Sequence, residues 1–341
     1  PQLYHFGLAL KTDVKSAVNG HVVITSADMS SSRMYALGGE WHFSWQQFLT
    51  HQEILNSSDE ATTISGVGGW QDSKNGHSFD PDGFATYHLH VVLQGVNENL
   101  ALRIPYIETA YRLYVDDELL ASAGIVSDSE NQAMAGYNST LVLLPQGLNE
   151  FSIRLHVSNY HSIWGGIWEP IVIGEADSLY KLNRNKVAFS LFILGTLLIT
   201  AIHALIQYYL MPDNKPSLIF ACLCFILILR EMTDENLYFG LSSLGLTFST
   251  LKKLSYLTYY VGIPVALYFV NLCFKSEFSR KTTRIFYSIG FLFSVYVLLS
   301  PVKYLGHSLM VFQYIAPVMM LYGLSRIIVA VRKKKVGANV M

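Results

Sequence analysis

Cysteine is scarce and unevenly placed in this chain of 341 residues. The three cysteines, Cys222, Cys224 and Cys273, all lie in the second half, so disulfide bonds cannot crosslink the first half. Small secreted eukaryotic domains usually carry such crosslinks, and their absence here favours a bacterial periplasm. The first residues also lack the basic start and the long apolar run of a signal peptide. This indicates that the chain as given begins after a removed leader.

Each half of the chain has few charges of one sign. Residues 1–183 contain 20 Asp and Glu but 8 Lys and Arg, a net charge of −12. Residues 184–341 contain 5 acidic and 16 basic residues, a net charge of +11. Such asymmetry indicates a membrane or a charged partner. It does not indicate nucleic acid, because the basic residues stand between apolar runs.

Catalytic and cofactor signatures are absent from the sequence. There is no G-x-S-x-G, H-E-x-x-H, Walker loop or kinase motif, and no pair of acids stands out as glycosidase carboxylates. The sequence therefore predicts no enzymatic activity and no cofactor for this chain. His88 and His90 would share one face of a strand, a spacing that can bind a metal ion but more often marks a polar face, so no metal site is predicted.

The first half of the chain alternates between apolar and polar residues. Residues 86–93, 111–117 and 151–157 follow a strict period of two, which predicts half-buried antiparallel strands. The residues predicted to point inward are Tyr87, Leu89, Val91, Leu93, Tyr111, Leu113, Val115, Phe151, Ile153, Leu155 and Val157. Many short strands separated by turn signals, without a clear amphipathic helix, predict an all-β sandwich or jelly roll. We assign residues 1–28 to an N-terminal segment, 29–178 to this β domain and 179–186 to a connector.

The second half of the chain is a series of apolar segments. Its candidate membrane spans are residues 187–211, 217–236, 254–274, 285–300 and 309–331. The first has 25 residues without a charge, enough to cross about 30 Å of hydrocarbon. The second span is weaker because it continues past Arg230. Residues 187–341 are therefore expected to form a transmembrane helical domain in contact with membrane lipid.

The loops between these spans differ in charge. Alternate loops hold Lys215, then Lys275, Arg280, Lys281 and Arg284, then Arg332, Lys333, Lys334 and Lys335, whereas the opposite loops hold Lys252, Lys253 and Lys303. The richer side should be cytoplasmic, which places the β domain in the periplasm and the helices in the bacterial inner membrane. Because the chain stops after a basic loop, we expect a fragment cut before a sixth span. A homodimer is compatible with this organisation.

A cluster of aromatic and polar residues predicts a ligand site in the β domain. Sugars bind by stacking on aromatic faces while polar groups fix their hydroxyls. The candidate ligand-binding residues are Trp70, Arg112, Tyr114, Asn159, His161, Trp164, Trp168 and Glu169. Alternatively, Trp168 begins a strand and fills the core, Asn159 braces a turn, and Arg112 and Tyr114 form a solvated face.

Three polar residues stand out within the predicted spans. A buried ionisable group in a membrane is costly and normally has a partner, and Asp234 lies one helical turn from Arg230. Alternatively, Arg230 extends its side chain to the interface. His203 and Gln207 are one turn apart on the first span, where they can form hydrogen bonds between helices.

Together these motifs resemble the bacterial seven-transmembrane receptors with diverse intracellular signalling modules. Residues 37–45 are similar to the family's L-x-G-E-W-x-F-x-W strand, and residues 69–89 to its W…G-x-A-T-Y-x-L stretch. Residues 102–117 resemble its L-R-I-P…A-Y-R-L-x-V-N-G hairpin, with Asp-Asp in place of Asn-Gly. Residues 157–170 resemble its V-S-N-F…G-G-L-W-x-P ending, and residues 254–284 its third and fourth spans.

The resemblance implies a galactose-binding-like jelly roll that senses a small molecule or glycan, and seven spans leading to a cytoplasmic output module. That module would be a diguanylate cyclase, a histidine kinase or a phosphatase. The later spans and the output module are missing from this sequence. A membrane-anchored glycan-processing enzyme with a carbohydrate-binding domain is the alternative, followed by a transporter or channel with an appended outer domain.

Overall fold

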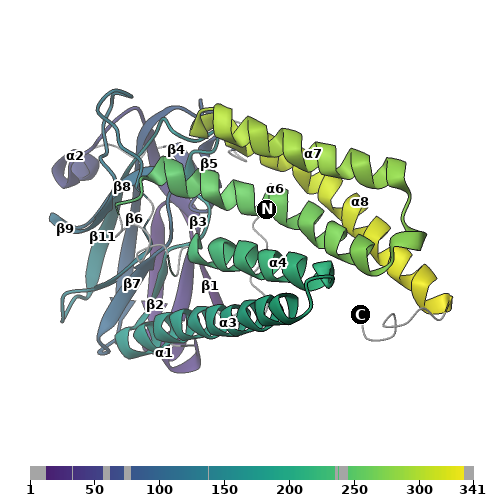
Figure 1. The fold of residues 1–341 in the computed structure, drawn as a ribbon. Helices are drawn as coiled ribbons and strands as arrows, with labels where there is room; N and C mark the ends of the chain where they lie inside the picture. The colour runs from purple at the N-terminus through teal and green to yellow at the C-terminus, as the bar shows by residue number, and fades with distance from the viewer. Residues whose placement is uncertain are drawn as a thin grey trace. The chain divides into compact units, whose positions relative to one another are not determined.

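The computed structural model describes residues 13–32, 34–56, 62–72, 78–136, 138–234, 237 and 245–333. The chain divides into two compact units, a β unit at Pro1–Val187 and a helical unit at Ala188–Met341. Figure 1 shows strands in the first and long helices in the second. The expected fold class, a β jelly roll followed by a helical bundle, is confirmed.

The β unit is a sandwich of short strands. Its strands are β1 (Asp13–Ala17), β2 (His21–Thr25), β3 (Met34–Trp45), β4 (Thr62–Ser65), β5 (Gly68–Gly69), β6 (Gly83–Gln94), β7 (Leu100–Ile104), β8 (Ala110–Val115), β9 (Glu118–Ala123), β10 (Thr140–Leu143), β11 (Glu150–Asn159), β12 (Gly166–Ile167) and β13 (Val172–Glu175). Helices α1 (Ser26–Ser32) and α2 (His51–Asn56) and a 3-10 turn (Trp70–Asp72) lie between strands. The main path runs in the order β10-β7-β13-β3-β6-β11-β8-β9, and β5 and β12 form a separate pair.

Strand β3 belongs to both layers of the sandwich. Its first half pairs with β13 and β1, and its second half pairs with β4 and β6. The change of layer occurs at Gly39, which has φ +85°, and an added Cβ there would lie 2.3 Å from the backbone nitrogen of Ala17. Only glycine adopts this conformation without strain. One strand can therefore wrap around the core and nearly close the sheet.

The core lies between the two layers and is rich in aromatic residues. All the residues that the alternation predicts to point inward are buried. They contact Trp41, Phe43 and Trp70, which are also buried. Period two therefore identified the buried face of β6, β8 and β11 correctly.

Two boundaries differ from the sequence-based expectation. Strands β1 and β2 pair in parallel with β3 and β6, so the sheet begins well before residue 29. Parallel edge strands of five residues give little sequence signal, because few of their side chains are buried. The expected connector is not a loop: it forms the first turns of helix α3 (Ala176–Leu210), where Leu179 and Leu182 pack with Ala101 and Val172 of the sheet.

The described part of the helical unit contains five long helices: most of α3, then α4 (Lys215–Met232), α6 (Phe248–Cys273), α7 (Arg280–Leu299) and α8 (Leu305–Arg332). Within the described residues, four helices have the length and apolarity to cross a membrane: α3, α6, α7 and the helix that ends at Arg332. Helix α4 is not among them, because its 18 residues include Lys215, Arg230 and Glu231. Each of the five predicted spans therefore overlaps a long helix of the described residues, and α4, the weakest of them, is too charged to be a candidate span.

Candidate functional site

Two tryptophans form the centre of a loop cluster in the β unit. Trp164 and Trp168 lie edge to face, with ring centroids 5.5 Å apart and an interplanar angle of 81°. Both are half-buried, as is His161. Partly exposed aromatic rings next to polar groups provide the surface on which sugar rings stack. We call Gln71, His161, Trp164 and Trp168 the loop cluster.

The loops that carry these tryptophans are joined by hydrogen bonds. Strand β12 pairs with β5, and the backbone nitrogen of Trp70 donates to the oxygen of Gly165 at 3.1 Å. The side-chain amide of Gln71 donates to the oxygen of Ile163 at 2.7 Å. Gly165 lies so close to the Trp70 ring that an added Cβ would be 2.2 Å from it. The cluster is therefore held in place before any ligand binds.

Two of the predicted ligand-binding residues, Trp70 and Asn159, are buried inside the β unit. Trp70 is completely buried and contacts Phe43 and Trp45. Asn159 is also completely buried, donating to the oxygens of Pro81 and Ser162 and accepting from the nitrogen of Ser162. Asn159 therefore braces a turn, the alternative that the sequence left open. Neither side chain is available to a ligand in this conformation.

Glu169 and Arg103 form an ion pair next to the loop cluster. Their closest atoms, Arg103 Nη1 and Glu169 Oε2, are 3.8 Å apart, and both side chains are partly buried. Glu169 therefore already has a cationic partner on β7. The described residues contain no group of three or more His, Cys, Asp or Glu that could hold a metal ion.

Arg112 and Tyr114 lie elsewhere, on the outer face of β8. They stand opposite His156 and Arg154 of β11, respectively. The Arg154 guanidinium lies 4.3 Å from the centroid of the Tyr114 ring, in a cation–π contact. Sequence reasoning missed Arg154 and His156, although the same period-two alternation places them opposite the inward residues of β11. We call these four residues the basic face.

A strap formed by residues 46–56, including α2, covers part of this face. The oxygen of Leu49 accepts hydrogen bonds from Arg154 Nη1 and His156 Nε2, both at 2.9 Å. Thr86 Oγ1 donates to the oxygen of Gln47 at 2.7 Å and accepts from the nitrogen of Leu49 at 3.1 Å. Arg154 is consequently only 5% exposed. Burial lowers the pKa of Arg154 and also that of His156.

Polar residues of the predicted spans make contacts between helices. Gln207 of α3 accepts a hydrogen bond from the Ser217 hydroxyl of α4 at 3.1 Å. Arg230 of α4 donates to the Ser255 hydroxyl of α6 and is exposed at the surface of the helical unit. His203 is exposed on α3. Gln207 and Arg230 therefore link neighbouring helices, as polar side chains in membranes commonly do.

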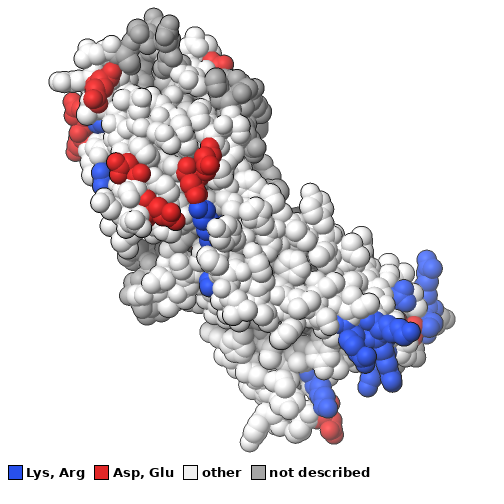
Figure 2. All heavy atoms as spheres, turned by 90° about the horizontal axis from the view of Figure 1, so that it is seen from above, with Lys and Arg blue, Asp and Glu red and all other residues white. Residues whose placement is uncertain are grey.

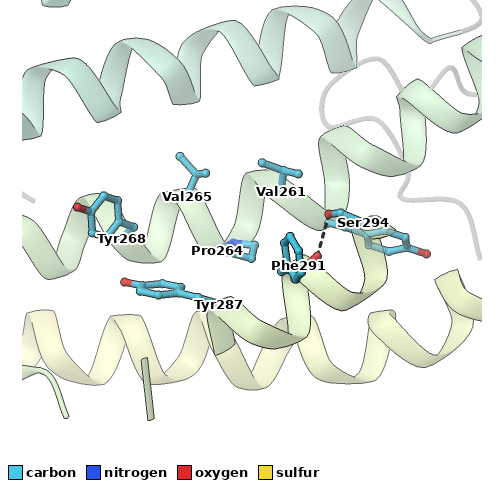
Figure 3. Close-up of a pocket in the computed structure, with 9 residues that line it drawn as sticks. Val261, Pro264, Val265, Tyr268, Tyr287, Phe291 and Ser294 are labelled. Carbon is cyan, nitrogen blue, oxygen red and sulfur yellow. Dashed lines mark hydrogen bonds between the residues drawn. The ribbon is translucent and has the colours of Figure 1, made fainter. Parts of the chain in front are cut away.

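An apolar groove of about 420 Å³ lies along α6 and α7 (Figure 3). It is lined by Tyr260, Val261, Pro264, Val265, Tyr268, Tyr287, Gly290, Phe291 and Ser294. The Ser294 hydroxyl donates to the oxygen of Gly290 at 2.8 Å, so it does not offer its proton to the groove. Pro264, which lies inside α6 and has no backbone N–H to donate, is one of the lining residues.

Gly290 is expected to be essential for close packing of α7 on α6. In Gly290→Ala the new Cβ would lie 2.4 Å from Pro264 Cγ, and we expect a loss of about 1–3 kcal/mol of stability. Gly195→Ala is the matched control, because a Cβ on Gly195 of α3 meets nothing within 4 Å. It should raise helix stability by up to about 1 kcal/mol. Thermal unfolding of the two variants in detergent checks this, and shifts of the same sign would refute it.

Basic residues gather at one end of the helical unit (Figure 2). They lie just after the end of α6, in the first turns of α7 and at the end of α8. These residues are Lys275, Arg280, Lys281, Arg284, Arg332 and Lys333. The Lys333 ammonium lies 2.6 Å from the carboxylate of Glu277, whose side chain is only 5% exposed. This ion pair connects the loop after α6 to the end of α8.

Comparison with known families decides the class of the helical unit. Residues 186–341 match the family described as 7TM diverse intracellular signalling. With a jelly roll before it in the sequence and four apolar helices among the described residues, the chain fits the receptor architecture that its motifs predict. No curated protein matches the chain.

Solved structures similar to part of this chain include a β-galacturonidase and a β-glucuronidase. A GH2 β-galacturonidase from Eisenbergiella tayi bound to galacturonate is 16% identical, with a TM-score of 0.28 over 40% of this chain and 23% of the enzyme. A β-glucuronidase from Faecalibacterium prausnitzii is 13% identical, with a TM-score of 0.32 over 41% of this chain and 31% of the enzyme. The chain thus spans less than a third of the length of either enzyme.

Proposed function

We propose that this chain is the sensory part of a bacterial inner-membrane receptor. Its β unit faces the periplasm and binds a carbohydrate, and its helices pass the signal to a cytoplasmic output module. The observation that carries the proposal is the match of residues 186–341 to the family described as 7TM diverse intracellular signalling, directly after a jelly roll. The chain itself acts as a sensor and not as an enzyme.

The loop cluster is the proposed ligand site. Trp164 and Trp168 offer ring surface, Gln71 braces the loop through its bond to Ile163, and the half-buried His161 lies three residues before Trp164 in the same loop. The hydrogen bonds between the two loops reduce the ordering that binding requires, which favours affinity. A sugar ring would stack on one indole and exchange hydrogen bonds with the polar neighbours.

Helix α3 is the proposed path of the signal. It continues without interruption from Ala176 to Leu210. Its first turns pack on β7 and β13, and the backbone nitrogen of Ala176 donates to the oxygen of Asn99 at 2.8 Å. A ligand changes such an equilibrium only through its different affinity for two states of the protein. Strands β7 and β13 are therefore where a change in the sandwich would reach the helix.

Sugar binding by the intact chain in detergent tests the site. Titration with neutral and acidic cell-envelope oligosaccharides should give a calorimetric signal for at least one of them. Trp164→Ala combined with Trp168→Ala should weaken that binding at least about tenfold, because stacking area is lost. Tyr180→Ala, which removes an exposed aromatic ring of α3, should leave binding unchanged.

Two results would count against the site. Absence of a signal with every sugar, or unchanged affinity in the double tryptophan variant, would exclude the loop cluster as the carbohydrate site. Release of reducing sugar from any of the oligosaccharides would instead show the glycan-processing enzyme. Labelling of Asn138→Cys by a membrane-impermeant thiol reagent on intact cells, with the native cysteines as background, tests the periplasmic position.

A further inference from the structure

Four histidines stand in register on the outer face of three neighbouring strands. His21 of β2 is opposite His90 of β6, and His42 of β3 is opposite His88 of β6. The ring centroids are 5.3 Å apart for His21 and His90, 6.1 Å for His42 and His88, and 6.2 Å for His21 and His42. We call these four residues the histidine cluster. Each ring lies close enough to another for two positive charges to repel strongly.

The strap adds a fifth imidazole to this cluster. His51 is the first residue of α2, and its charge acts on His88 together with the charges of the other three histidines of the cluster. Both ring nitrogens of His88 and Nδ1 of His51 are buried without a hydrogen-bond partner. Burial, and then the neighbouring histidines, lower the pKa of His88 to about 4. The closed arrangement is therefore compatible with a neutral His88 and opposes its protonation.

Other charged groups surround the cluster on the elements packed against it. On β11, Glu150 lies 3.5 Å from His90, and Arg154 stands opposite His88. On the strap, Glu53 is held by Thr50 in the first turn of its own helix. Asp117 of the β8–β9 turn and Glu53 both act on Arg154. Glu150 can stabilise a charged His90, but Arg154 adds a positive charge beside His88.

The strap is the element whose displacement requires the least free energy. Helix α2 has no buried residue, and the strap begins at Gln46, which has a left-handed φ of +53°. Hydrogen bonds with Thr86, Arg154 and His156 hold the backbone of Gln47 and Leu49. The ring of Phe48 also packs against that of Phe84. Segments with few buried apolar contacts open before the rest of a domain does.

We propose that the strap is an acid-released cover of the basic face. Protonation of the histidine cluster and of His51 places several positive charges between the strap and the sheet. The strap then leaves, His51 moves away from the cluster, His88 becomes hydrated, and Arg154 and His156 become exposed. The domain would thus present a basic surface in acid and hide it at neutral pH. This device is independent of sugar binding at the loop cluster.

Hydrogen exchange of the intact chain in detergent tests the release. Amides of Gln46 and Leu49 are hydrogen-bonded when the strap is closed. After correction for intrinsic exchange, their protection should fall at least about tenfold between about pH 7.5 and about pH 5, while β6 and β11 stay protected. In the variant with His42→Gln and His88→Gln the fall should be less than about threefold. His307→Gln, at an exposed position of α8, should behave like the wild type.

Three results would overturn the proposal. One is unchanged protection of the strap in acid in the wild type. Another is an equal fall in the wild type and the double variant. The third is a simultaneous loss of protection in β6 and β11, which would show general acid unfolding. If the double variant does not fold, His21→Gln with His90→Gln takes its place under the same criterion, since His21 is exposed and tolerates substitution.

Discussion

Trp70→Ala is expected to lower the free energy of unfolding of the β unit by about 4 kcal/mol, the range for removing a large aromatic residue from a core. The Trp70 side chain is completely buried and touches Phe43 and Trp45. Its backbone also joins the two loops, through the bond to Gly165. Removing the ring would leave a cavity beside Gly165, and the glycine-rich loops could collapse into it only in part. Urea denaturation in detergent, followed by the circular dichroism of the sheet, measures the loss.

Trp164→Ala is the matched comparison, because it removes the same side chain from a half-buried position in the same loops. It should lower the free energy of unfolding by less than about 1 kcal/mol. The two variants separate stability from recognition, since the first should unfold the domain and the second should impair binding of a sugar. Equal destabilisation by both would mean that Trp164 belongs to the core, and the proposed ligand surface would then lose its main aromatic residue.

Alternation along the strands predicted the buried face because burial of every second residue is a local property. Leu89, Leu113 and Ile153 were assigned to the core from sequence, and all three are completely buried. The apolar runs located the long helices for a similar reason, because solvation by lipid acts on each residue of a span. The family motifs agree with this result, since they consist largely of the residues that build these strands.

Residue positions that depend on long-range contacts could not be predicted in the same way. Trp70 follows Gly68 and Gly69 and Trp164 precedes Gly165 and Gly166, and the sequence does not say which ring enters the core. The separation of Arg112 and Tyr114 from the loop cluster depends on strand order, which places them against Arg154 and His156. The strap over the basic face was missed entirely, because its hydrogen bonds join residues far apart in the sequence, such as 37 positions for Leu49 and Thr86 and 105 for Leu49 and Arg154.

Asn159→Asp is expected to destabilise the β unit as strongly as the loss of Trp70, by about 3–5 kcal/mol at neutral pH. The amide nitrogen of Asn159 donates to two backbone oxygens, of Pro81 and Ser162, both at 2.8 Å. A carboxylate of the same shape has no proton to donate, so it would face both oxygens with a negative charge while completely buried. The bond from the nitrogen of Ser162 would remain but could not compensate for this repulsion.

The pH dependence of this variant distinguishes electrostatic repulsion from loss of shape. Burial and the two oxygens raise the pKa of the new carboxyl in the folded state above its unfolded value. The unfolded chain therefore holds fewer protons between these two pKa values, and the stability of the variant relative to wild type should increase as the pH falls through that range. A protonated carboxyl can donate to one of the two oxygens. Asn138→Asp, at an exposed position, should show neither the loss of stability at neutral pH nor its recovery at lower pH. A deficit in Asn159→Asp that stays constant as the pH falls would mean that the turn tolerates the charge and that the geometry of the amide alone is responsible.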